Sequence, residues 1–199
     1  MGCYPDEMAA WAGAVDGDAE GFTAVYDRNL DRTYRHALRL AGSRHDAEDL
    51  TAGAFMELWR RRKHVRVVDG SVLPWLLVTV TNLERNRARS LRRYRSFLAS
   101  LPRTEATSPA ADSLVAESAT DGVVKDIRKA LRRLNPADAT LIALVAFEGY
   151  TSAQAAQALG ISQGAARTRL HRARRRIGSE LAWGPNQAGW TALNVEDRK

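Results

Sequence analysis

The chain has 199 residues, of which 45% are hydrophobic and 27% are charged. This composition supplies enough apolar side chains for compact cores and excludes a wholly disordered chain. Thirty basic against 23 acidic residues give a formal net charge of +7, which favours an anionic partner such as nucleic acid or an acidic surface.

Secreted proteins, membrane proteins and enzymes are the classes that the sequence disfavours. The single cysteine, Cys3, cannot form an internal disulfide, so we expect a reducing, cytoplasmic location. The N-terminus lacks a basic start followed by an apolar core, and no stretch approaches about 18 uninterrupted apolar residues, so membrane insertion is not expected. The four histidines show no metal-ligand spacing, and no glycine-rich loop is suited to cradle a phosphate. We therefore expect no catalytic residue, no metal and no cofactor.

Three helices are predicted in the first half of the chain. Residues 18–41 carry apolar side chains at spacings of three or four, as a single-faced amphipathic helix requires. The segment "SRHD", which starts at Ser43, has the capping-box pattern, and the helix behind it closes in the basic run "RRRK". Pro74 is placed to begin a third helix, which runs without glycine or proline to Leu98 and contains six arginines from Arg85 onward.

The second half is predicted to be helical as well, after a linker. Residues 100–121 are rich in Ser, Thr, Ala and Pro, which is typical of a flexible connection. Asn135 can then cap a helix that reaches Glu148. Thr151 and Gln154 form a further capping box, which opens a short helix ending at Gly160.

No strand-like alternation is long enough to build a sheet, so the predicted fold class is all-α. We expect two small helical domains joined by a flexible linker, with a helix-turn-helix in the C-terminal domain. The predicted boundaries are an N-terminal extension at 1–15, a first domain at 16–98, a linker at 99–121, a second domain at 122–182 and a C-terminal tail at 183–199.

The basic helix that begins near Ser162 is predicted to face a polyanion. At about 100° per residue, its small and aliphatic residues fall on one side and its polar and basic residues on the other. A short helix, a turn containing glycine and a longer basic helix form the layout that enters the major groove. The predicted DNA-contacting residues are Ser162, Gln163, Gly164, Arg167, Thr168, His171, Arg172 and Arg175. The alternative is an ordinary amphipathic helix with a solvated arginine face.

Two long segments together resemble the bacterial sigma factors of the extracytoplasmic-function (ECF) type, from about Asp16 to Leu181. The segment "GDAEGFTAVYDRNLDRTYRHALRLAGSRHDAEDLTAGAFMELWRRR" is similar to the family's second region, with "DAEDL" and "F..LWR" as its most specific parts. The segment "ALRRLNPADATLIALVAFEGYTSAQAAQALGISQGAARTRLHRARRRI" is similar to its fourth region. The resemblance implies a dissociable initiation subunit that binds core RNA polymerase through the β′ clamp helices and the β flap. It also implies recognition of −10 and −35 promoter elements and, commonly, an anti-sigma factor that holds the subunit inactive.

The resemblance assigns residues to two further surfaces. The residues implied in polymerase docking are Asp46, Glu48, Asp49 and Phe55. The residues implied in contacts with the −10 element are Asn82, Arg85, Asn86, Arg89, Arg92 and Arg93. The helix that begins near Ser162 is assigned to the −35 element.

The chain departs from the family pattern at two places. Ala52-Gly53 stands where many relatives have Gln-Glu, so we expect a locally weaker docking surface and a glycine that destabilises the helix. Val72 follows Gly70-Ser71 where a phenylalanine often occurs, which argues against base capture by this loop. The alternative function is a free-standing helix-turn-helix regulator that binds duplex DNA without polymerase.

Overall fold

The computed structural model describes residues 4, 6–100, 126, 129–131 and 133–180. These residues are helical apart from short connections, and the only β-type pairing among them is an isolated bridge between Val68 and Ser71. The all-α prediction is confirmed. The predicted linker and C-terminal tail lie almost entirely outside the described residues.

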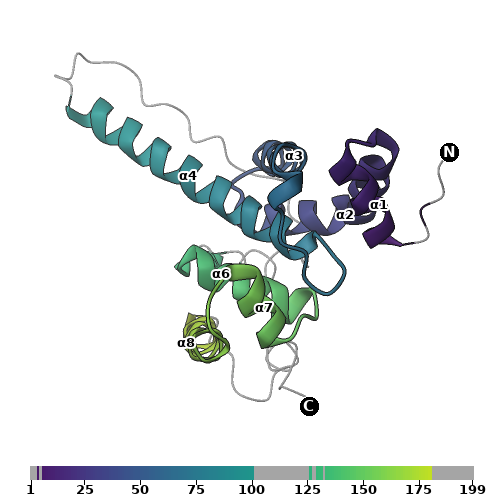
Figure 1. The fold of residues 1–199 in the computed structure, drawn as a ribbon. Coiled ribbons are helices and arrows are strands. Elements are labelled where there is room, and N and C mark those ends of the chain that lie inside the picture. The colour runs from purple at the N-terminus through teal and green to yellow at the C-terminus, as the bar shows by residue number, and fades with distance from the viewer. Residues whose placement is uncertain (1–3, 5, 101–125, 127–128, 132, 181–199) are drawn as a thin grey trace.

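The first half is a bundle of four α-helices and one short 3-10 turn (Figure 1). Asp18 caps the second helix by accepting hydrogen bonds from the backbone N–H groups of Glu20 and Gly21, and Ser43 caps the third by accepting from that of Asp46. Leu58, Leu73 and other aliphatic side chains fill the shared core. The elements are α1 (Glu7–Asp16), α2 (Ala19–Leu40), α3 (Arg44–Arg60), η1 (Arg62–His64) and α4 (Leu73–Ser100).

Helix α1 is an element that the sequence analysis did not predict, because residues 1–15 were assigned to an extension. Asp6 caps this helix by accepting a hydrogen bond from the Ala9 backbone N–H at 2.7 Å. Trp11 is 4% exposed and joins the core. Glu7 reaches the loop before α4, where its Oε1 accepts hydrogen bonds from Ser71 Oγ at 3.0 Å and from the Val72 backbone N–H at 2.7 Å. Helix α1 is therefore part of the first bundle.

The second half packs three helices around buried apolar side chains that are continuous with the core of the first bundle. They are α6 (Pro136–Ile142), which continues through the π-helical segment η2 (Ala143–Phe147), then α7 (Ser152–Leu159) and α8 (Gln163–Glu180). The predicted capping box is confirmed, since Thr151 and Gln154 each bond the other's backbone N–H. Leu141, Leu144, Leu170 and Ile177 are buried between these helices.

The two halves meet along the N-terminal part of α4, where α6 and α7 lie against it. The C-terminal half of α4 projects away from both bundles (Figure 1). Its side chains from Leu91 to Ala99 are all exposed. The long basic helix is thus anchored at one end and open to solvent at the other.

Candidate nucleic-acid interface

Helix α8 presents two clearly different faces. Its inner face buries Ala166, Leu170, Ala173 and Ile177 at 3% exposure or less. The eight residues predicted to contact DNA are all exposed, which agrees with the rotation argument made from the sequence. They are Ser162, Gln163, Gly164, Arg167, Thr168, His171, Arg172 and Arg175.

A tight turn sets the angle between α7 and α8. Gly160 ends α7 in the left-handed conformation, with φ 66°, which a residue without Cβ adopts at no steric cost. The backbone N–H of Ile161 donates to the Ala156 carbonyl at 3.0 Å, and Ser162 Oγ then accepts from the Ala165 N–H at 3.2 Å. The predicted helix-turn-helix is present, and the N-terminus of α8 stands at the surface.

The arginines of α8 differ in whether they form ion pairs with carboxylates of the described residues. Arg169 pairs with Asp138 of α6 at 3.0 Å, and Arg176 pairs with Glu180 one turn further on at 3.6 Å. Arg172 and Arg175 form no ion pair with a carboxylate of the described residues. Both side chains are exposed on the outer face of α8.

A second basic face runs along α4. At about 100° per residue, the six predicted residues fall within roughly 120° of one another. All six side chains are exposed. They are Asn82, Arg85, Asn86, Arg89, Arg92 and Arg93.

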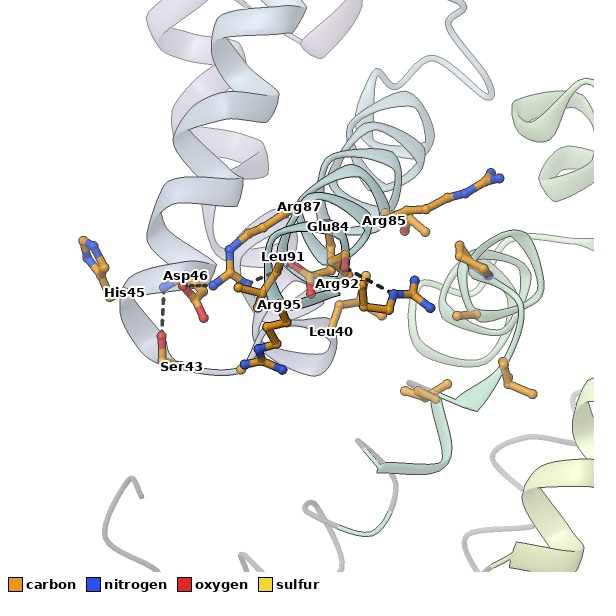
Figure 2. Close-up of a pocket in the computed structure, with 17 residues that line it drawn as sticks. Leu40, Ser43, His45, Asp46, Glu84, Arg85, Arg87, Leu91, Arg92 and Arg95 are labelled. Carbon is orange, nitrogen blue, oxygen red and sulfur yellow. Dashed lines mark hydrogen bonds and ion pairs between the residues drawn. The ribbon is translucent and has the colours of Figure 1, made fainter. Parts of the chain in front are cut away.

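The adjoining face of α4 lines a groove of about 1220 Å³ between α4, the turn from α2 to α3, and residues 131–139. Figure 2 shows that arginines and leucines share this lining, and that Arg87 reaches across to Asp46. Ser43 Oγ accepts a hydrogen bond from the backbone N–H of the same Asp46. The arginines of the groove are Arg85, Arg87, Arg92 and Arg95, and its leucines are Leu40, Leu91, Leu131 and Leu134.

The four residues implied in polymerase docking differ in accessibility. Glu48 and Asp49 are exposed on α3. The side chain of Asp46 is only 18% exposed, because Arg87 pairs with it. Phe55 is 3% exposed, with its ring centroid 4.6 Å from that of Tyr26. Phe55 therefore supports α3 from within the core and does not itself present a surface to a partner.

Met56 is a residue of this surface that the sequence analysis missed. Its side chain is 72% exposed, the largest value among the exposed large hydrophobic residues of the described chain. It lies on the same side of α3 as Asp49, seven residues or about two turns away. The available signal was helix rotation, because at about 100° per residue Met56 lies about 160° from Leu58 of the apolar stripe.

Gly53 and Val72, the two departures from the family pattern, have structural explanations. Helix α3 continues without interruption through Gly53, where a Cβ would meet Leu83 Cδ1 of α4 at 3.2 Å. The glycine thus permits close packing of α3 on α4. Val72 is fully buried, so the loop before α4 offers no side chain at this position for base capture.

The described part of the chain contains no cluster of three or more His, Cys, Asp or Glu side chains placed to hold a metal ion. None of its helices combines the length and apolar character needed to cross a membrane.

A helix-turn-helix on a two-bundle, all-α scaffold with a second basic helix defines a class of DNA-binding transcription proteins. Two family models match the chain, "Sigma-70 region 2" over residues 25–94 and "Sigma-70, region 4" over residues 125–177. Together they cover more than half of the 199 residues. The chain belongs to the sigma-70 family, among the sigma factors of the ECF type, which are transcription initiation factors.

Relatives from several bacteria support this assignment. The ECF RNA polymerase sigma factor SigE of Mycolicibacterium smegmatis is 33% identical over 156 residues, which cover 78% of this chain and 59% of the relative. The ECF RNA polymerase sigma factor SigL of Mycobacterium tuberculosis is 29% identical over 173 residues, covering 85% of this chain and 94% of the relative. The chain therefore spans less than two thirds of the first relative and nearly all of the second.

Two solved structures share the fold. CnrH, solved in complex with the cytosolic domain of CnrY, superposes with a TM-score of 0.63 at 19% identity, covering 88% of this chain and 97% of CnrH. The sigma factor RpoE of Bartonella quintana, solved with the anti-sigma factor NepR, gives a TM-score of 0.58 at 22% identity, covering 81% and 96% of the two chains.

Proposed function

We propose that this protein binds core RNA polymerase and directs it to promoters that carry a −10 and a −35 element. The observation that carries the proposal is the pair of exposed basic faces, one on α4 and one on α8, each held by a separate bundle. Arginine and asparagine side chains on such faces suit phosphate contacts and base-edge contacts respectively. The matches to both sigma-70 regions, in this order along the chain, support the same function.

In this proposal the face of α8 reads the −35 element. Gln163, Arg167 and Thr168 are placed near the N-terminal end of the helix, which is the end that enters the major groove. The Thr168 hydroxyl already donates to the Gly164 carbonyl at 3.0 Å, so it offers its oxygen as an acceptor and its methyl group as an apolar contact. Arg172 and Arg175 lie further along and suit the phosphate backbone.

The face of α4 reads the −10 element. Asn82 is the first exposed residue of this face, and the arginines that follow it extend into the projecting half of the helix. An amide that contacts an unstacked base, followed by cations that track the backbone, is a suitable arrangement for single-stranded DNA. In this proposal the strand runs along the C-terminal half of α4, which projects away from both bundles (Figure 1).

Polymerase docks on α3 in this proposal, against the β′ clamp helices, while the second bundle contacts the β flap. Glu48 and Asp49 supply exposed negative charge, and Met56 supplies an exposed apolar contact beside them. Asp46 contributes through its pairing with Arg87, which fixes α3 against α4. An anti-sigma factor is a further proposed partner.

Replacement of Asp49 by lysine tests the docking face. The side chain of Asp49 is 68% exposed, so Asp49→Lys reverses a surface charge with little effect on the fold. We expect weaker binding to core polymerase in a pull-down or titration, and unchanged binding of a −35 duplex. Asp16→Lys, at the end of α1, is the matched control. Equal affinity of the Asp49→Lys and wild-type proteins for polymerase would remove Asp49 from the docking site.

Transcription in vitro tests the whole proposal. The protein is added to sigma-free core polymerase with fragmented genomic DNA of the source organism, and transcript 5′ ends are sequenced. Discrete start sites that share upstream motifs near −10 and −35 are the expected result. Specific duplex binding by the protein alone, with no new start sites from active polymerase, would instead favour the free-standing regulator.

A further inference from the structure

Helix α4 changes from buried to exposed between two neighbouring residues. Thr81 is 4% exposed, and no residue from Asn82 to Ala99 is buried. Asn82 is itself exposed and is the first residue of the proposed −10 face. Neighbouring residues of a helix are separated by only about 100° of rotation and 1.5 Å of rise. A restraint on Thr81 is therefore also a restraint on the direction in which Asn82 points.

Thr81 is held by hydrogen bonds inside the first bundle. Its Oγ1 lies 3.0 Å from Nε2 of His36, on the neighbouring helix α2, and donates to the Leu77 carbonyl at 2.9 Å. Because the hydroxyl hydrogen of Thr81 is used in the bond to Leu77, Nε2 of His36 is the donor to Thr81. His36 is 1% exposed, so water does not compete for this bond. Thr140 of α6 donates to the same oxygen at 2.9 Å.

The apolar contacts of α4 restrain its rotation less sharply than this hydrogen bond does. Apart from Thr81, the buried residues of the helix are apolar, and they are Leu73, Pro74, Leu76, Leu77 and Val80. Apolar burial has no preferred direction, whereas a hydrogen bond depends on angle as well as distance. The ion pair between Arg87 and Asp46 holds α4 further along, but the Arg87 side chain is 42% exposed and water weakens such a pair. His36 thus supplies a buried, directional contact at the turn where the −10 face begins.

We infer that His36 is a positioning residue for promoter recognition, because its hydrogen bond with Thr81 sets the rotation of α4 and so aims Asn82 at a base of the −10 element. This inference rests on the proposed function, in which Asn82 reads that element. His36 acts through α4 and does not touch DNA, since it is buried on α2. An amide that reads a base edge uses its donor and its acceptor together. A small rotation of α4 therefore weakens discrimination between bases.

Two variants separate positioning from stability. Thr81→Val removes the hydroxyl and leaves the buried N–H of His36 without an acceptor, so we expect both stability and −10 discrimination to fall. The double variant His36→Leu/Thr81→Val removes both polar groups, which should recover most of the stability. Thr140 keeps its bond to the Pro136 carbonyl, at 2.9 Å, in either variant. A positioning role predicts that the double variant is stable and still lacks −10 discrimination.

The measurement is transcription in vitro by core polymerase with each variant, on promoters that differ only at their −10 positions. We expect wild type to prefer one base at the position that Asn82 reads, and Asn82→Ala to reduce this preference by about fivefold or more. The double variant should show the same reduction, with −35 preferences unchanged. Adding Asn82→Ala to the double variant should cause no further reduction, because His36 acts through Asn82.

Two controls change the same cluster but keep the hydrogen bond between His36 and Thr81. Thr81→Ser retains the hydroxyl and should restore the wild-type preference. Thr140→Val removes a neighbouring hydroxyl and leaves the bonds of Thr81 to His36 and Leu77 in place. We expect this variant to keep the −10 preference as well. Urea denaturation of every variant measures stability alongside transcription.

The outcomes separate the inference from the proposed function. If Asn82→Ala loses a −10 preference that the stable double variant retains, His36 is not a positioning residue, while the proposed function stands. If wild type gives no new start sites with active polymerase, the proposed function is wrong and the inference is wrong with it.

The hydrogen bond itself is tested without polymerase or DNA. Nδ1 of His36 has no hydrogen-bond partner among the described residues, so we expect the ring proton on Nε2. Nitrogen-proton NMR spectra of protein labelled with ¹⁵N-histidine detect this proton, and His36→Leu assigns its signal. We expect the proton to exchange slowly with water. Exchange as fast as that of His45, whose side chain is 82% exposed, would show that the ring is not held and would overturn the inference.

Discussion

A base contact and a phosphate contact by Arg167 predict different effects of its removal on DNA specificity. Its exposed position near the N-terminal end of α8 suits either contact. We expect Arg167→Ala to cost about 1 to 3 kcal/mol of binding to the preferred −35 sequence and to relax specificity at one position. Competition binding against single-position −35 variants measures this. Arg176→Ala, which removes an arginine paired with Glu180, is the control. A uniform loss across all variants would show that Arg167 contacts only phosphate.

At Gly164 we expect one substitution to change fold stability and DNA binding in opposite directions. A Cβ built there meets no atom within 4 Å, so alanine fits the fold and favours the helix by up to about 1 kcal/mol. The same methyl group would stand on the DNA-facing side, where the bare backbone allows close approach. We expect Gly164→Ala to raise the free energy of unfolding and to weaken −35 binding. Urea denaturation and duplex titration measure the two effects, and tighter DNA binding would contradict the close-approach role.

At the scale of the elements, two glycines within helices differ in the atoms that an added side chain would meet. Gly21 of α2 lies under α1, where a Cβ would be 2.6 Å from the Ala10 carbonyl oxygen and 3.0 Å from the Ala14 nitrogen. Both atoms belong to backbone, which cannot move aside as a side chain can. Gly53 of α3 instead faces the mobile end of Leu83.

We expect Gly21→Ala to destabilise the first bundle by about 1 to 3 kcal/mol, because α1 must shift away from α2. Gly53→Ala should stay within about 1 kcal/mol of wild type, since gained helix propensity offsets a small displacement of Leu83. Chemical denaturation followed by circular dichroism measures both. Equal losses for the two variants would mean that the α1–α2 contact is looser than the structure indicates.

Local signals were sufficient to predict most of the helices and the two basic faces. Ser43 and Thr151 mark helix starts, and the outward position of Arg167 follows from helix rotation alone. Helix α1 was missed because its apolar residues are mostly alanines, which leave a weak periodic pattern, although Asp6 and Gly17 do cap it. The pairing of Arg32 with Glu148 joins residues 116 apart, and no local pattern encodes such a contact. Helix rotation places Met56 away from the buried Leu58, so the sequence held the signal for this exposed residue, whereas the burial of Phe55 against Tyr26 depends on packing.

At the scale of the whole molecule, the buried His36 couples stability to pH. Burial, with a smaller contribution from the nearby charge of Arg39, lowers the pKa of His36 to about 3. The folded protein therefore keeps this ring neutral, whereas the unfolded chain binds a proton near the ordinary histidine pKa of about 6.5. Stability from this group is complete above that pH and is lost as the pH falls toward the folded value.

Between about pH 7 and pH 4.5 we expect a loss of roughly 2 to 3 kcal/mol from His36. Carboxylates titrate in the same range, so the quantity to measure is the difference between wild type and His36→Gln in urea denaturation at both pH values. The variant is expected to lose less stability on acidification than wild type. Parallel pH dependence in the two proteins would show that His36 is hydrated in the native state.

Glu7 of α1 contacts Ser71 and Val72, two residues that lie inside the part of the chain matched by region 2. The shared region 2 pattern begins at residue 25, beyond α1, yet the loop that starts α4 donates two hydrogen bonds to Glu7. The start of α4, which lies inside the region 2 match, is therefore stabilised partly by α1, which lies outside it. Relatives without such a helix must satisfy the equivalent backbone group in another way, so positions 7 and 71 are expected to vary together across the family.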